Sequence, residues 1–372
     1  MPPVPVLKQR TSLRLPLETF HPVVRPSPAL PADPALGGIA RDIIAEAKYA
    51  ATVAAAEQRD APGVLYGLMR EFMSSRTPAA QNRAKVRSTA LLTSSDAMRQ
   101  LTFGRYAAIN TSEYLTVGST ESIKRLANLH VDPDLLRGGI AKFQQLHLVT
   151  PSNAPVDPNV KAGLEYKKLR VFIAAVRCVE ETDEVGSDKI NIGAVKATPF
   201  GETNVIDQFT VSSDFDEDEV VNYSGLGHKI TGWNLVTDQP WPVSYLVTIA
   251  MAEKDDGGFY KFLMELWNWV KEKALALIAA GVGAAVGGAL GGIIGAAVGA
   301  IVGVLIGWII SLFDNQDDII GAIPCTFSLG RATKSYYDWL GLTSAEGVKT
   351  TLHFKGDGGY YRVRLRYKVF KD

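Results

Sequence analysis

The spacing of apolar residues divides the chain into a helical first part and a second part made of strands. Helices are predicted over residues 33–58, 62–74, 78–92 and 132–147. The first of them begins with Asp33 as N-cap and Pro34 as the first helical residue, a pair that favours a helix start. Residues 33–150 are therefore expected to form a helical domain.

From residue 168 onward the apolar positions follow a period of two, which is typical of strands. Strands are predicted over residues 169–179, 190–195, 205–211, 230–235, 243–251, 348–354 and 361–370. Because these strands lie on both sides of a long apolar insertion, residues 165–257 and 320–372 are expected to form one antiparallel β-sandwich. The predicted fold class is therefore α+β.

The insertion, residues 258–319, begins with an amphipathic helix and continues as a long uncharged segment. Residues 274–313, about forty in all, carry no charge and contain ten glycines. Seven of these glycines recur at every fourth position: Gly283, Gly287, Gly291, Gly295, Gly299, Gly303 and Gly307. Each glycine costs about 1 kcal/mol in a solvated helix, whereas in lipid such a ridge lets helices pack closely. The segment therefore predicts a glycine-zipper membrane hairpin or one long, tilted helix.

Aromatic residues flank the uncharged segment where the lipid headgroups would lie. Phe262, Trp267 and Trp269 precede it, and Trp308 lies near its end. Amphipathic rings favour the membrane interface, so these four residues are expected to anchor the segment there. The alternative interpretation is a pair of helices buried in the centre of a large soluble protein.

The first 32 residues differ in composition from the rest of the chain. Nine of the 19 prolines lie within residues 1–34, which predicts an extended tail. The N-terminal residues contain no apolar stretch typical of a signal peptide. The protein is therefore expected to be made in the cytoplasm and then released or delivered to a target membrane, with the inner membrane as the alternative location.

Charge and reactive residues narrow the function classes. The 39 basic and 39 acidic residues balance, but residues 1–167 carry a net charge of +6 and the remainder −6. The two cysteines are expected to be buried thiols, and the five histidines are scattered without a metal-binding or catalytic spacing. No enzyme activity and no nucleic-acid partner are expected.

Two acidic loops of the sandwich are the candidate ion site. They contain Asp183 and Asp188 in one loop and Asp214 and Asp216 in the other. Alternation of the strands places both loops at the same end of the sandwich, and loop carboxylates are ligands that Ca²⁺ prefers. These four residues are the predicted calcium ligands, and a solvated acidic rim is the alternative. No other cofactor is expected.

The last strand carries basic residues on one face, namely Arg362, Arg364, Arg366 and Lys368. Such a face is usually solvated or paired across to carboxylates, and the alternative is that it docks on anionic headgroups.

The glycine ridge resembles the glycine-zipper segments of membrane-active bacterial proteins, including pore-forming toxins. The resemblance covers about forty residues and implies membrane helix packing rather than one particular family. The expected function is permeabilisation of a lipid bilayer by a homo-oligomer of the inserted transmembrane hairpin. The alternative is a resident membrane-anchored binding protein with a β-sandwich domain and no toxic activity.

Overall fold

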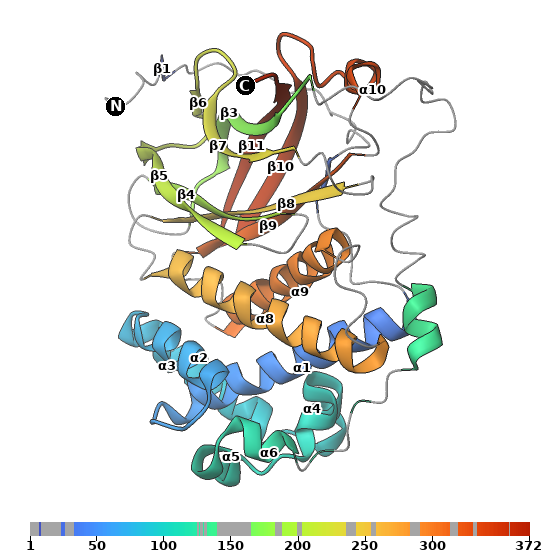
Figure 1. The fold of residues 1–372 in the computed structure, drawn as a ribbon. Coiled ribbons are helices and arrows are strands. Elements are labelled where there is room, and N and C mark those ends of the chain that lie inside the picture. Colours follow the sequence, from blue (N-terminus) through green and yellow to red (C-terminus); the bar gives the residue numbers. More distant parts are fainter. Residues whose placement is uncertain are drawn as a thin grey trace.

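The computed structural model has mixed helices and antiparallel sheets, so the predicted α+β class is confirmed. The structure describes residues 7–8, 24–26, 33–124, 126, 129, 132–139, 165–182, 188–198, 203–235, 243–253, 258–282, 291–312, 319–329, 333–356 and 358–372. The sandwich, the inserted helices and the helical region form three successive layers in that order (Figure 1).

The helical region is built around one central helix. Its elements are α1 (Pro34–Glu57), α2 (Val64–Ser74), α3 (Pro78–Leu92), α4 (Asp96–Phe103), the 3₁₀ helix η1 (Gly104–Ala108), α5 (Thr111–Val117) and α6 (Ser119–Lys124), followed by a helix over residues 133–139. The Asp33 carboxylate accepts hydrogen bonds from the first backbone amides of α1, as its sequence predicts. Residues 49–56 of α1 are all buried. Alanines occupy most of these positions, so neighbouring elements can approach α1 from every side.

Two antiparallel sheets face each other across a common core. Sheet A contains, in order, β1 (Leu7–Lys8), β6 (Val220–Asn222), β3 (Lys168–Glu180), β11 (Gly359–Phe370) and β10 (Val348–Gly356), with β7 (His228–Asn234) also paired to β3. Sheet B contains β2 (Val24–Pro26), β9 (Ile319–Leu329), β8 (Val243–Glu253), β4 (Asp188–Ala197) and β5 (Thr203–Phe215). The short helix α10 (Lys334–Trp339) connects β9 to β10. Both cysteines, Cys178 and Cys325, are buried free thiols in this core, as expected.

Strand β8 in the middle of sheet B is buried on both of its faces. Along β8, Tyr245 and Val247 face sheet A, whereas Leu246 and Ala250 contact the helices. This double burial explains why β8 reads as a nearly continuous apolar run.

The described part of the insertion forms two helices, α8 (Phe259–Val282) and α9 (Gly291–Leu312). They contact each other and lie between sheet B and α1, so that they close the space between the sandwich and the helical region (Figure 1). Residues 283–290, which join the two helices and would hold the turn of the predicted hairpin, lie outside the described residues.

Several elements were not predicted from the sequence. Strand β9 contains Pro324, and a proline inside a strand argues against that assignment. Here the pairing of β9 with β2 begins at Cys325, one residue beyond the proline, so no bond to β2 requires the missing amide hydrogen. Two short segments of the proline-rich tail, β1 and β2, pair with the sheets.

Candidate functional site

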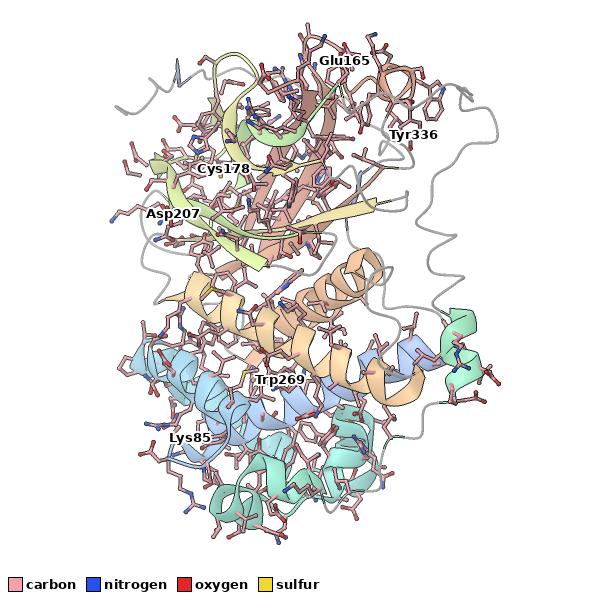
Figure 2. The ribbon with its side chains drawn as sticks, viewed as in Figure 1. Lys85, Glu165, Cys178, Asp207, Trp269 and Tyr336 are labelled. Carbon is pink, nitrogen blue, oxygen red and sulfur yellow. The ribbon has the colours of Figure 1, made fainter. Side chains whose placement is uncertain are left out.

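The apolar face of α8 is fully covered in the folded protein. Its buried residues are Phe259, Phe262, Leu263, Leu266, Trp267, Val270, Ala274 and Ile278, which lie at helical spacing along the predicted amphipathic helix. The ring of Phe262 stacks on Phe72 of α2 with centroids 4.0 Å apart and planes 17° apart. Trp267 is only 1% exposed, and Trp269 packs against the same core on the helical side of the molecule (Figure 2).

The polar side of α8 is attached to the helical region by ion pairs. Lys261 Nζ lies 2.7 Å from Oε1 of Glu71 on α2, where both side chains are exposed. Near the other end, Lys273 Nζ lies 2.8 Å from Oε2 of Glu46 on α1, whose side chain is 9% exposed. Since Glu46 is shielded from water, losing its cation would leave a buried carboxylate unpaired and would cost more than losing the exposed pair.

Glu46 belongs to a buried polar network that the sequence analysis missed. Arg105 binds both carboxylate oxygens of Asp42, at 2.7 Å and 2.9 Å. The hydroxyl of Tyr106 lies 3.0 Å from Glu46 Oε2 and 3.1 Å from Asp42 Oδ2, and burial with these carboxylates raises the Tyr106 pKa. Asp42 and Glu46 lie four residues apart, on the same side of a mostly apolar helix. Two acids at this spacing in such a helix indicate that partners inside the protein bind them. Two cations and two carboxylates thus join α1, η1 and α8.

Helix α9 is covered by α1 and sheet B. Its buried residues are Val298, Ile301, Val302, Leu305, Ile306, Ile309 and Leu312. Trp308 is half-buried, and Lys48 Nζ lies over its ring at 5.5 Å from the centroid, where burial lowers the Lys48 pKa. The four predicted interface anchors, Phe262, Trp267, Trp269 and Trp308, therefore all contact the protein core in this state.

The glycine ridge can be followed at one position only. Gly283 and Gly287 lie outside the described residues, and Gly291, Gly295, Gly299 and Gly307 lie in α9 without described surroundings. A Cβ added to Gly303 would lie 3.5 Å from Cδ of Pro324, which is ordinary contact. At Gly303 the ridge therefore faces strand β9 in the described part of the structure.

Both ends of the insertion emerge at one point of sheet B. The strand before it, β8, pairs with the strand after it, β9, and the ladder runs from Val243↔Leu329 to Ala252↔Ile319. Because paired residues of neighbouring strands are about 5 Å apart, the insertion leaves and re-enters the sheet at neighbouring positions. This end of the β8–β9 ladder, at Ala252 and Ile319, is here called the root of the insertion. Within the described residues, the strand order of both sheets is complete without α8 and α9.

The predicted acidic loops do come together. Oε1 of Glu181 accepts a hydrogen bond of 2.6 Å from the backbone amide of Glu217, and Asp188 pairs with Phe215 in the β4–β5 ladder, next to Asp214 and Asp216. Asp183 lies outside the described residues. Among the residues that are described, no group of three or more acidic, histidine or cysteine side chains has a metal-binding arrangement. Calcium binding stays a prediction.

Asp188 faces inward instead of toward solvent. It accepts hydrogen bonds from the amide and hydroxyl of Thr182 and from the hydroxyl of Tyr361. The same Thr182 hydroxyl lies 2.9 Å from Oε1 of Glu253, the last residue of β8. Burial raises the Asp188 pKa, Glu181 and Asp216 raise it further, and the bonds from Thr182 lower it. This buried acid cluster (Thr182, Asp188, Glu253 and Tyr361) therefore lies at the root of the insertion.

A cavity of about 350 Å³ opens beside the start of α1. Its lining residues are Pro34, Ala35, Gly38, Ile39, Leu129, Asp132 and Leu135. The carboxylate of Asp132 already accepts the backbone amides of Asp134 and Leu135. Among its described lining residues the cavity is otherwise apolar and offers no acid–base pair or nucleophile for catalysis.

Within the described residues, no helix combines the length and apolar character that a membrane crossing requires. No protein-family model matches the chain, and neither curated proteins nor solved structures gave a significant match.

Proposed function

We propose that this protein permeabilises lipid bilayers by releasing helices α8 and α9 from the fold, inserting them and assembling as a homo-oligomer. The observation that supports the proposal is that both ends of the insertion meet the sandwich on neighbouring paired strands. Since Ala252 and Ile319 pair on neighbouring strands, the α8–α9 unit can swing away without changing the strand order of the sandwich.

The folded state supplies the shelter that such a segment needs in water. The apolar face of α8 is covered by α2 and sheet B, and that of α9 by α1 and β9. An uncharged segment of about forty residues would otherwise expose a large apolar surface and aggregate. Insertion in lipid would replace these protein contacts with contacts to acyl chains and, along the glycine ridge, with contacts to other copies.

The test is to hold α8 against the helical region and measure dye release from liposomes. Glu71→Cys with Lys261→Cys, joined by a reducible bis(methanethiosulfonate) cross-linker, would tie α2 to α8 at a solvent-exposed ion pair. The matched control joins Asp60→Cys to Arg70→Cys, which also form an ion pair but both lie within the helical region.

We expect the unlinked protein and the control to release dye, and the α2–α8 conjugate to release it only after reduction. Release by the conjugate at the control rate would show that α8 does not leave the fold. Absence of release by unlinked protein from every vesicle composition would contradict permeabilisation itself, and strict detergent dependence from synthesis onward would favour the resident anchored protein.

A further inference from the structure

The outer face of sheet A gathers a large positive charge. On β11, the residues that point away from the core include Arg362, Arg364, Arg366 and Lys368. The neighbouring strands add Lys349 and Lys355 from β10, Lys168, Arg170 and Arg177 from β3, and Lys229 from β7. These ten residues are here called the basic face.

The cations of the basic face stand opposite one another instead of opposite carboxylates. In the ladders, Arg362 pairs with Arg177, Arg366 with Lys349, and Lys368 with Arg170. Like charges placed directly opposite each other destabilise a sheet. No carboxylate therefore stands directly opposite these cations in the ladders, and the carboxylates that contact them come from outside the paired strands.

Few described carboxylates offset this charge. Asp218 contacts Arg177, Glu346 contacts Lys349 and lies 3.8 Å from Arg366, and Arg170 donates a hydrogen bond to the backbone of Asp372. Glu180 also lies on this face, opposite Tyr360. The net charge therefore stays strongly positive, and a partner that binds this face must be anionic.

We propose that the basic face docks on the anionic headgroups of a lipid bilayer. The ten cations lie side by side on three adjacent strands and one flanking strand and form a broad charged surface. Each basic residue near such headgroups strengthens the affinity for the membrane about fivefold.

The aromatic rings of this face favour headgroups over single-stranded nucleic acid. Binding of bases requires open ring faces for stacking. Here the Tyr360 ring already carries Lys355 at 4.4 Å and Arg362 at 5.2 Å, and the Phe370 ring carries Arg170 at 4.4 Å. Phe172, the third ring of the face, is only 8% exposed.

The basic face also reaches the root of the insertion. The turn between β10 and β11 touches the start of β9, because a Cβ added to Gly356 would lie 2.3 Å from the carbonyl oxygen of Ile320. Lys355 precedes this turn and is exposed. Docking through this face would bring the root of α8 and α9 to the edge of the lipid contact, so the inference deepens the proposed function while docking itself does not require insertion.

The test is co-sedimentation with vesicles of phosphatidylcholine, with and without phosphatidylglycerol. The variant replaces three lysines of the basic face, Lys229→Gln, Lys355→Gln and Lys368→Gln. The matched control replaces Lys85→Gln, Lys124→Gln and Lys189→Gln, which lie outside this face; Lys85, for example, is on the helical region (Figure 2). Thermal melting checks that both variants fold.

We expect the unmodified protein and the control to bind only vesicles containing phosphatidylglycerol, and the basic-face variant to bind them on the order of a hundredfold more weakly. The α2–α8 conjugate should bind like unlinked protein, because docking does not require insertion. Unlinked protein that binds these vesicles but releases no dye would contradict the proposed permeabilisation and leave the docking surface standing. Equal binding by the basic-face variant would overturn the docking surface. Binding to an oligonucleotide without binding to anionic vesicles would also overturn it, in favour of a nucleic-acid partner.

Discussion

The hydroxyl oxygen of Thr182 lies 2.6 Å from Oδ1 of Asp188 and thereby joins the start of β4 to the end of β3. The same oxygen lies 2.9 Å from Oε1 of Glu253. A hydroxyl group has a single proton to donate, so both contacts are hydrogen bonds only when one carboxyl group is protonated. Burial raises the Asp188 pKa, which favours the protonated form in the folded protein.

Asp188→Asn should therefore change how stability depends on pH. An acid whose pKa is raised on folding stabilises the protein below its unfolded pKa of about 3.9, and this contribution is lost as pH rises through the folded pKa. The asparagine amide mimics the protonated acid and does not titrate. Denaturant unfolding should show the variant gaining stability relative to the unmodified protein as pH rises from about 4 to 7. A difference that stays constant over this range would contradict proton sharing in the buried acid cluster.

The stack of Phe72 on Phe262 exists only while α8 is packed in the fold, because Phe262 would leave with α8 on insertion and Phe72 would stay on α2. Phe72→Leu and Phe262→Leu should each lower the free energy of unfolding by about 1–2 kcal/mol. Phe72→Leu should speed dye release, since it weakens the cover alone. Phe262→Leu should speed it less, since it also removes apolar surface from the inserting helix. Identical kinetics in both variants would indicate that α8 does not contact lipid.

Local patterns predicted those parts of the fold that one stretch of sequence determines by itself. The Asp33 cap, the alternating strands and the apolar face of α8 all follow from spacing alone. Strand β9 could not be predicted, because a proline inside a strand argues against that assignment, and β9 pairs with β2 only from Cys325 onward. The partners of Glu46 and Glu253 are also invisible in sequence, since Lys273 and Thr182 approach them only through the tertiary fold.

The glycine ridge should govern association in lipid and have a smaller effect on the folded state. Gly291→Ile with Gly295→Ile keeps the segment apolar but separates facing backbones. Cross-linked oligomers and dye release should fall together while vesicle binding persists. Gly303→Ala is the control, because its added methyl group meets Pro324 at contact distance and keeps a small residue on the ridge. Unchanged oligomers in the isoleucine variant would refute a role for the ridge.

Calcium binding between the acidic loops can be tested by thermal melting. The inward direction of Asp188 leaves Asp214 and Asp216 as the described candidates of the predicted set. A bound ion stabilises the folded state by mass action, so the melting temperature should rise with calcium up to about the millimolar range of weak sites. Asp216→Asn should remove the rise. A melting temperature that is independent of calcium would leave a solvated acidic rim.

The ion pair between Lys273 and Glu46 should control how readily α8 leaves α1. Lys273→Met keeps the apolar stem but leaves the buried Glu46 carboxylate without its cation, which should cost up to about 3 kcal/mol of stability. Glu46→Gln in the same chain removes the unpaired charge and keeps an acceptor for the Tyr106 hydroxyl, so the double variant should recover part of the loss. Dye release should be fastest for Lys273→Met and intermediate for the double variant. If the two single changes are additive in unfolding and in dye release, the pair does not hold α8 to α1.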